Sequence, residues 1–517
     1  MTRSHRPAPF PPAHLSPQMT YTSKTTPFAH QKKILEETQD LESFALWWEM
    51  GVAKTKPIID TIGHLFESDK INGALVLAPK SVAPNWVNDE IPIHMGVSPC
   101  RMKVFLWDTG KAGNKGYRAE LDRFLKTPSD QLAILVMSYD AIMTERTPGA
   151  ERGLLKGKEA AKKMLTERTT MMVLDESARI KNPATKRTKR VLAAGLHAAY
   201  RRILTGTPVS NSPFDVFAQL KFLDPGIWER IGCSSFAAFK ATFGVWMEHT
   251  RNDTGQRFQQ LVDYQNLTQL NKSVDENGSR LLKDDVLDLP PKLYEKRVFK
   301  MCPVQRKLYD DLKKDFMVWL DGGEMITAPL AITRMLRLQQ VTSGYCPIDS
   351  EGPKQAMVEI DPNPRLACLM DIVEDVPHQA IIWAKFQNDI DLISAALEKL
   401  GKTYVVYDGR VNQQDREERR GKFKEGDAQF FVANPAAAGE GLTLHMAKTC
   451  IYYNSTYRLG DRLQSEDRAH RAGMDDKPVQ YIDIVAEGTI DATIIRALRT
   501  KNDLAAIVTG DKLKEWI

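Results

Sequence analysis

The chain contains little cysteine, and the cysteines it has lie far apart. There are 6 among 517 residues, and no two of them form a Cys-X-X-Cys pair. Structural zinc sites and the disulfide frameworks of small secreted domains both need cysteines at short, regular spacings. The sequence therefore argues against both, and we expect a cytoplasmic protein in a reducing environment.

Long apolar runs are also missing. No uninterrupted apolar stretch approaches the roughly 18 residues of a membrane span, and the first residues carry no apolar core of the signal-peptide type. We therefore expect no membrane contact. Charge of one sign is not in large excess, because 71 basic and 66 acidic residues leave a net charge of +5. Such a mildly basic chain permits nucleic-acid binding without demonstrating it.

Proline is concentrated near the N-terminus, where 6 of the first 27 residues are proline. Little else in this segment could pack into a core, so residues 1–27 are predicted to form a disordered tail. The rest of the chain is too long for one ordinary hydrophobic core. We therefore expect two or more domains.

From residue 28 onward, short apolar runs alternate with helical stretches in both halves of the chain. The strands expected from these runs are 74–78, 132–138, 171–174, 202–204, 380–383, 403–407, 429–433, 449–453 and 479–485. Continuous apolar strands separated by helices are typical of parallel sheets covered on both faces. The pattern predicts an α/β protein with two parallel-sheet lobes in tandem.

The residue pattern between residues 227 and 345 differs from that of the flanking regions. Aromatic residues recur there at helical spacing, and strand-like runs are few. We expect helical insertions in this region, with 293–299 as the main strand. The predicted organisation is a first lobe over 28–300 with a helical insertion near 227–285. A helical protrusion and crossover follows over 301–345, and a second lobe over 346–517 ends in a C-terminal helix.

A candidate phosphate loop lies near the start of the first lobe. Gly51, Val52 and Ala53 form a turn before Lys54 and Thr55, which open a helix. Backbone N–H groups, a helix N-terminus and an ammonium together suit a triphosphate. Lys54 is predicted to contact the β- and γ-phosphates and Thr55 to bind Mg²⁺. Alternatively, the segment is only a helix N-terminus, because Ala53 occupies a usual glycine position.

An acid pair ends the apolar run over 171–174. Ligands of open α/β sheets bind at the carboxyl ends of strands, where Asp175 and Glu176 are expected. Asp175 is predicted to hold Mg²⁺, and Glu176 to orient or deprotonate the attacking water. Thr205 and Thr207 follow a later strand and are predicted to couple the acid pair to the rest of the cleft. Solvated acids and a plain turn are the alternatives.

Two arginines near the C-terminus complete the set. Arg468 and Arg471 are three residues apart, so on a helix both guanidinium groups lie on one turn. We favour arginine fingers acting on the γ-phosphate over surface ion pairs. Gln464 in the same run is predicted to contact the nucleotide. Gly441 lies in a glycine-containing segment that lets the backbone approach phosphate.

Taken in order, these motifs resemble those of the Swi/Snf-type DNA translocases of superfamily-two helicases. The resemblance rests on Gln31, Gly51–Thr55, Asp175–Asn182, Thr205–Asn211, Ala438–Leu444 and Gln464–Gly473. Further segments make it Swi/Snf-like rather than RNA-helicase-like, namely 180–182, 289–292, 336–344 and 467–471. The resemblance implies two RecA-like lobes, ATP and Mg²⁺ as cofactors, and recognition of adenine by Gln31. It also implies movement along double-stranded DNA, and we expect a monomer.

Contacts with DNA are expected from basic and hydroxyl side chains near strand ends. Lys80 and Ser81 follow one first-lobe strand, Lys181 follows the acid pair, and Lys385 and Arg410 hold comparable positions in the second lobe. A translocase grips the backbone rather than the base edges, so affinity should depend on salt and not on sequence. For each of these residues a solvated surface position is the alternative.

The leading hypothesis is a DNA-dependent ATPase that couples hydrolysis to movement along duplex DNA. A strand-separating or branch-migrating helicase is a second possibility. A third is a nucleotide-gated DNA clamp with weak turnover, in which Ala53 has reduced hydrolysis. Comparing ATP turnover on duplex DNA, single strands and RNA separates these hypotheses.

Overall fold

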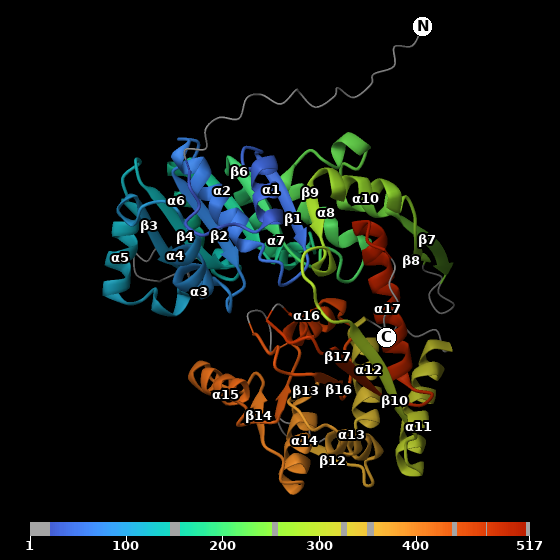
Figure 1. Cartoon of the computed structure of the whole chain (residues 1–517). Coiled ribbons are helices and arrows are strands. Elements are labelled where there is room, and N and C mark those ends of the chain that lie inside the picture. The colour runs from blue at the N-terminus through green and yellow to red at the C-terminus, as the bar shows by residue number, and fades with distance from the viewer. Residues whose placement is uncertain are drawn as a thin grey trace. The chain divides into compact units, whose positions relative to one another are not determined.

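The structure is a computed structural model that describes residues 21–144, 156–250, 257–321, 328–348, 356–436, 442–471 and 473–512. Within these residues it contains two parallel β-sheets with helices packed around them (Figure 1). The chain divides into two compact units. One comprises residues up to 44, 54–174 and 193–202, and the other comprises 45–53, 175–192 and the residues from 203 onward. The predicted α/β class with two parallel-sheet lobes is confirmed.

The first sheet has the strand order β3-β4-β2-β5-β6-β1-β9. In that order its strands are Met102–Leu106, Leu132–Ser138, Gly73–Ala78, Thr170–Asp175, Tyr200–Leu204, Ser43–Trp48 and Gly278–Leu281. β2 and β5 pair in parallel with Leu75 opposite Met172, and every residue of both strands is buried. Such strands are apolar throughout because helices cover both faces of a parallel sheet.

The helices of this part of the chain follow the apolar periodicity of the sequence. They are α1 (Ala29–Thr38), α2 (Thr55–Glu67), α3 (Ala83–Asn85), α4 (Ile91–His94), α5 (Lys115–Leu125), α6 (Gly157–Glu167), α7 (Lys186–Gly195), α8 (Val216–Leu223), α9 (Phe236–Phe243) and α10 (Leu267–Glu276). α2 is the most deeply buried of those near the phosphate loop, with every residue from Lys56 to Phe66 buried. Its position fixes where the loop before it points.

The segment before α1 corrects the predicted extent of the N-terminal tail. Tyr21 is buried, and its hydroxyl donates to Asp60 Oδ1 at 3.0 Å and accepts from Gly96 N at 2.9 Å. Thr25 Oγ1 lies 2.7 Å from His94 Nδ1. Residues 21–27 are therefore packed rather than disordered, because one aromatic side chain anchors them. Residues 1–20 lie outside the described residues.

The second sheet has the order β10-β17-β16-β13-β15-β14. Its strands are, in that order, Lys292–Phe299, Val479–Ala486, Thr449–Tyr452, Ala380–Trp383, Phe430–Ala433 and Tyr404–Tyr407. The helices of this region are α11 (Pro303–Asp321), α12 (Ala328–Thr342), α13 (Pro364–Asp375), α14 (Gln387–Lys399), α15 (Gln413–Glu425), α16 (Leu459–Ala469) and α17 (Ile490–Thr509). The five strands expected in this half all form, each within a residue of its predicted ends.

The predicted limit of the first lobe at residue 300 needs correction. β10, at 292–299, pairs in parallel with β17, with Tyr294 opposite Tyr481, and so belongs to the second sheet. β9, by contrast, pairs with β1 in the first sheet, with Gly278 opposite Ala45. We propose that the boundary lies between β9 and β10, at the Asp288–Lys292 segment. The remaining domain limits stay predictions.

The region expected to be a helical insertion also contains strands. β7 (Gly244–Thr250) and β8 (Arg257–Tyr264) pair antiparallel, and β9 is a four-residue strand. Trp246 of β7 stacks on Phe214, with ring centroids 6.5 Å apart. The hairpin mixes apolar and polar residues that are mostly exposed, and β9 is short with a glycine at its start, so neither gives a clear sequence signal. β11 (Tyr345–Ile348) and β12 (Ala356–Glu359) form another antiparallel pair.

No helix of the described residues is long and apolar enough to cross a membrane.

Candidate nucleotide and DNA sites

The phosphate loop connects β1 to α2. Gly51 has φ 88° and Ala53 has φ 57°, so both lie in the left-handed region. Glycine adopts this region freely, whereas for alanine it costs about 1–2 kcal/mol. Such strain persists only where the surrounding structure enforces it, often at ligand-binding loops. The turn therefore keeps a glycine-like shape although an alanine occupies the position.

The N-terminus of α2 carries no side-chain cap. The helix begins at Thr55, directly after its N-cap residue Lys54, whose side chain makes no capping hydrogen bond. Pro57 has no N–H to satisfy. The other N–H groups of that turn, together with the helix dipole, form the kind of end that binds phosphate. The loop and this helix end fit the phosphate groups of a nucleotide.

Magnesium is the metal that this chemistry implies. Mg²⁺ in nucleotide sites is held by one or two protein oxygens together with phosphates and water. Among the residues that the structure describes, no group of three or more His, Cys, Asp or Glu side chains could hold a metal ion. A threonine hydroxyl and an aspartate carboxylate are oxygen donors of the kind that Mg²⁺ takes. Thr55 and Asp175 stay the predicted ligands.

Gln31 lies buried in the first turn of α1. Its Oε1 accepts a hydrogen bond from the backbone N–H of Phe28 at 2.8 Å. This bond fixes the start of the helix in the manner of a capping box. The ring of Phe28 is 64% exposed. Recognition of adenine by Gln31 stays a prediction.

The acid pair lies at the carboxyl end of β5, as predicted. Asp175 is the last residue of the strand, and Glu176 follows with φ 53°, a left-handed conformation that is uncommon for glutamate. Thr205 Oγ1 donates to Glu176 Oε2 at 3.3 Å and accepts from the backbone N–H of Thr207 at 3.2 Å. The two threonines therefore contact the acid pair directly. Their coupling role stays a prediction.

A buried glutamine that gives no sequence signal reinforces this link. Gln219 in α8 accepts from Ser177 Oγ at 2.7 Å and donates to the carbonyl of Pro208 at 2.8 Å. Ser177 follows the acid pair, and Pro208 follows the two threonines. Gln219 thus joins the two motifs through a second hydrogen-bond path.

Arg468 lies in the last turn of α16, whereas Arg471 lies beyond the helix. The prediction that both share one helical turn is wrong, because His470 has non-helical angles of φ −84° and ψ 88°. Arg468 is buried, and its Nη1 donates to the carbonyl of Leu442 at 3.2 Å. The side chain of Arg471 lies next to Gly51 of the phosphate loop. If Gly51 carried a Cβ, that atom would lie 3.8 Å from Arg471 Cγ.

A buried ionic cluster holds α16 on the second sheet. Arg462 donates to both carboxylate oxygens of Asp483, at 2.6 and 2.8 Å, and to Glu466 at 2.9 Å. Lys292 and the Tyr294 hydroxyl of β10 also reach Glu466. Burial alone raises the pKa of Glu466, but Lys292 and Arg462 outweigh it and hold that pKa below its usual value. The helix that carries Arg468 is therefore anchored by charge on its buried side.

Two further predicted site residues belong to the motifs of the second half of the chain. Gln464 is half-buried in α16, and its role stays a prediction. Gly441 lies outside the described residues.

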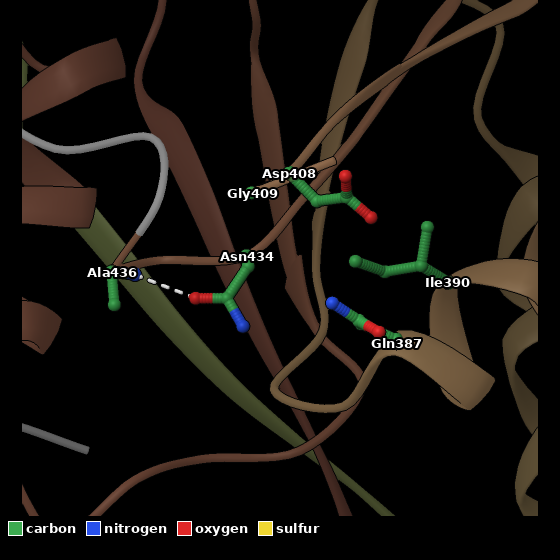
Figure 2. Close-up of a pocket in the computed structure, with 6 residues that line it drawn as sticks. All are labelled: Gln387, Ile390, Asp408, Gly409, Asn434 and Ala436. Atoms are coloured by element: carbon green, nitrogen blue, oxygen red, sulfur yellow. Dashed lines mark hydrogen bonds between the residues drawn. The ribbon is translucent and has the colours of Figure 1, made fainter. Parts of the chain in front are cut away.

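A cavity of about 350 Å³ lies at the carboxyl ends of β14 and β15. Figure 2 shows Gln387, Asp408 and Asn434 gathered around one space, with Ile390 beside them. Gln387 is the first residue of α14, whose N-terminus has no side-chain cap. Polar side chains and an uncapped helix end at a strand edge suit a phosphate group.

Both second-lobe DNA candidates flank this cavity. The carbonyl of Lys385 accepts from Asn434 Nδ2 at 2.6 Å, and Arg410 Nε donates to Asp408 Oδ2 at 2.7 Å. Lys385 Nζ donates to Gln339 Oε1 at 2.5 Å, and burial lowers its pKa to about 8. The guanidinium of Arg410 is shared between Asp408 and Asp391. DNA contact by either residue stays a prediction.

The first-lobe candidates differ in their surroundings. Lys181 Nζ donates to Ser210 Oγ at 2.6 Å and lies 4.0 Å from Asp215, so it is held near the threonine motif. Lys80 and Ser81 are exposed after β2. Exposure permits contact with a backbone phosphate, and that contact stays a prediction for all three.

The segment 336–344 forms a buried hydrogen-bond hub at the end of α12. Asn454 donates to Ser343 Oγ at 3.0 Å and to Asp389 Oδ2 at 2.5 Å. Asp389, in the first turn of α14, is completely buried, and burial raises its pKa to about 7. This carboxyl gave no sequence signal. The hub joins α12 to the loops that carry Lys385 and Asn454, so the motif has a structural function here.

Two protein-family models match the sequence of this chain. A model described as "SNF2-related domain" matches residues 33–343, which is more than half of the chain, and one described as "Helicase conserved C-terminal domain" matches 364–473. The chain belongs to the SNF2-related family. This SNF2-related chain therefore has the domain pair of the SNF2-type helicase-like ATPases, as its motif order predicts.

Curated relatives of the SNF2-related chain are distant. It is 26% identical over 89% of its length to the mouse "SWI/SNF-related matrix-associated actin-dependent regulator of chromatin subfamily A member 1". It is 27% identical to a rice "Probable chromatin-remodeling complex ATPase chain", again over 89%. The chain covers 41% and 38% of these relatives. A solved "Sulfolobus solfataricus SWI2/SNF2 ATPase core in complex with dsDNA" matches over 95% of both chains at 22% identity, with a TM-score of 0.39.

Proposed function

We propose that this SNF2-related chain is a DNA-dependent ATPase that couples ATP hydrolysis to movement along double-stranded DNA. Membership of the family supports an ATPase of helicase type. Duplex DNA as the substrate, and movement along it, are the parts that we propose. The observation that carries the proposal is the position of Arg471 beside Gly51. An arginine from the last motif thus lies at the phosphate loop, where a finger can act on the transferring phosphoryl group.

The residues around the loop have distinct tasks in this proposal. Lys54 and the N-terminus of α2 bind the phosphates, and Thr55 and Asp175 would hold Mg²⁺, which would supply positive charge to the phosphates. Glu176 orients the attacking water and accepts its proton, and the hydroxyl of Thr205 fixes that carboxylate. Arg471 stabilises the negative charge on the transferring γ-phosphoryl group. Thr205 and Thr207 connect this chemistry to the segment containing Ser210 and Lys181.

DNA binding in the proposal uses phosphate contacts alone. The cavity flanked by Lys385 and Arg410 takes one backbone phosphate, because the N-terminus of α14 lies there without a side-chain cap. Lys80, Ser81 and Lys181 serve the other lobe. Contacts of this kind carry no base information, so affinity depends on salt concentration rather than sequence.

Because the chain spans about two-fifths of the length of its relatives, its biological DNA substrate and its partners are not carried over from them. A monomer acting in the cytoplasm is part of the proposal. Two other activities use the same residues. A strand-separating or branch-migrating helicase would hydrolyse ATP on single strands, and a nucleotide-gated clamp would retain DNA with weak turnover.

Steady-state ATP hydrolysis with duplex DNA, single-stranded DNA and RNA tests the proposal. We expect duplex DNA to give the largest stimulation. Stimulation by RNA alone would contradict it. No turnover with any polymer, together with nucleotide-dependent retention on DNA, would favour the clamp.

A further inference from the structure

Lys283 is a buried lysine outside the motifs described above. It follows β9 and is 1% exposed. Its Nζ donates to Asp467 Oδ1 at 2.5 Å and to the carbonyl of His470 at 2.9 Å. All of these residues belong to the second compact unit. Asp467 immediately precedes Arg468, and His470 immediately precedes Arg471, so one ammonium holds the neighbours of both arginines.

The other end of Lys283 is fixed to the phosphate loop. Its backbone N–H donates to Glu49 Oε2 at 2.9 Å, and the N–H of Glu49 donates to the carbonyl of Leu281 at 2.8 Å. A Cβ on Gly51 would lie 3.4 Å from Lys283 Cε. The stem of the lysine therefore lies along the same glycine that Arg471 passes. One side chain spans from the start of the loop to the arginine segment.

Two lysines favour the ionised form of Asp467. Burial alone raises the pKa of Asp467, but Lys283 and Lys292 outweigh it and keep that pKa below its usual value. Lys292 Nζ lies 3.8 Å from Asp467, and His470 Nε2 lies 2.8 Å from the carbonyl of Pro290. Asp467 is thus ionised and held from two directions.

We propose that Lys283 is a positioning residue that sets Arg468 and Arg471 against the phosphate loop. The proposal rests on the proposed function and names a residue on which its arginine chemistry depends. A small displacement of a catalytic group from its productive place costs on the order of 10²-fold in rate. Loss of Lys283 should therefore reduce transition-state stabilisation more than it reduces nucleotide binding. A buried ion pair with a purely structural role is the competing explanation.

Two variants separate these explanations. Lys283→Met leaves the buried Asp467 with Lys292, 3.8 Å away, as its remaining counter-charge, so it should lower the unfolding midpoint as well as activity. Lys283→Met combined with Asp467→Asn removes both charges and should recover most of the midpoint. If Lys283 positions the arginines, the double variant stays roughly 10²-fold below wild type in kcat, with the KM for ATP nearly unchanged. Wild-type kcat in the double variant would overturn the proposal.

Arg365 and Asp491 provide a matched control. Arg365 of α13 and Asp491 of α17 form an ion pair in the same compact unit, with side chains 0% and 8% exposed, against 2% and 8% for Lys283 and Asp467. The variant Arg365→Met/Asp491→Asn also removes one basic and one acidic buried charge. It should keep wild-type kcat. An equal loss of kcat in the control would show that any buried ion pair of this unit matters and would overturn the specific role of Lys283.

A binding measurement keeps this test independent of DNA stimulation. ADP with aluminium fluoride mimics the transferring phosphoryl group, and transition-state analogues bind more tightly than ground-state ligands. We expect wild type to prefer ADP–aluminium fluoride over ADP, and the double variant to lose roughly 10²-fold of that preference with unchanged ADP affinity. An unchanged preference overturns the role of Lys283. Absent DNA stimulation with a normal preference overturns only the proposed translocase. No preference in wild type overturns both arginine roles and Lys283 with them.

Discussion

Replacing Ala53 with glycine relieves backbone strain at the phosphate loop. Alanine at φ 57° carries about 1–2 kcal/mol of left-handed strain. Glycine removes that strain but makes the unfolded chain more flexible, at a cost of about 0.4–1 kcal/mol. The difference predicts that Ala53→Gly stabilises the folded protein by about 1 kcal/mol. Since Ala53 is exposed, the glycine leaves no cavity to offset this gain.

The same substitution shows when the strain is present. If the strain developed only with nucleotide bound, Ala53→Gly would tighten ATP binding by that strain of about 1–2 kcal/mol, or about 5- to 30-fold, because 1.4 kcal/mol corresponds to tenfold. We take the left-handed angle of Ala53 to be a property of the loop with and without nucleotide, so we expect little change in the dissociation constant of ATP. The loop should therefore gain stability without gaining affinity.

Denaturant unfolding and equilibrium ATP binding, compared between wild type and Ala53→Gly, measure these quantities. Ala112→Gly is a matched control, because Ala112 lies in a loop with an ordinary φ of −57°. That control should lose about 0.4–1 kcal/mol. If Ala53→Gly is destabilised like the control, residue 53 is not left-handed in solution. If its affinity rises with no gain in stability, the strain develops only with nucleotide bound.

Four further predictions concern single side chains. Glu176→Gln should bind ATP as wild type does while kcat falls by about 10²–10⁴, and wild-type turnover would remove Glu176 from the mechanism. Arg471→Ala should lose about 10³–10⁵ in kcat with a modest change in ATP affinity, and an equal loss of affinity would point to a ground-state role. Burial lowers the pKa of Lys385 to about 8, so DNA affinity measured by fluorescence anisotropy should fall between about pH 7 and pH 9 as the lysine loses its charge. Lys385→Arg should abolish that fall, because arginine stays charged. A fall of the same size in the variant would exclude Lys385 as its source. Burial raises the pKa of Asp389 from 3.8 to about 7. Its contribution to stability is therefore full below about pH 4 and is lost as the pH rises through about 7, by roughly 4 kcal/mol at most. Asp389→Asn should flatten this dependence of the free energy of unfolding on pH, and an unchanged dependence would show that the carboxyl is ionised throughout.

The sequence predicts the fold well where strands are buried on both faces. The run 132–138, apolar up to its final serine, and the fully apolar run 380–383 form β4 and β13 with those bounds. β9 and the β7–β8 hairpin were missed because their residues are few, polar or exposed, and only tertiary pairing reveals them. Tyr21 was missed for a different reason. A single aromatic residue anchors a segment whose composition otherwise predicts disorder.

The candidate site was predictable in its parts and not in its connections. The phosphate loop, the acid pair and Thr205 follow from local motifs, since each needs only a strand end and a turn. Lys283 lies in no such motif. Its role depends on contacts with residues 234 positions before it and 184 after it, and no local pattern records such a pairing.

Displacement of a third strand from duplex DNA tests the central claim most directly. A duplex carrying a triplex-forming oligonucleotide is compared with a forked duplex of the same sequence, using wild type and Glu176→Gln in the presence of ATP. The account predicts that wild type releases the third strand without separating the fork, and that Glu176→Gln releases nothing. Separation of the fork with the third strand retained would contradict it.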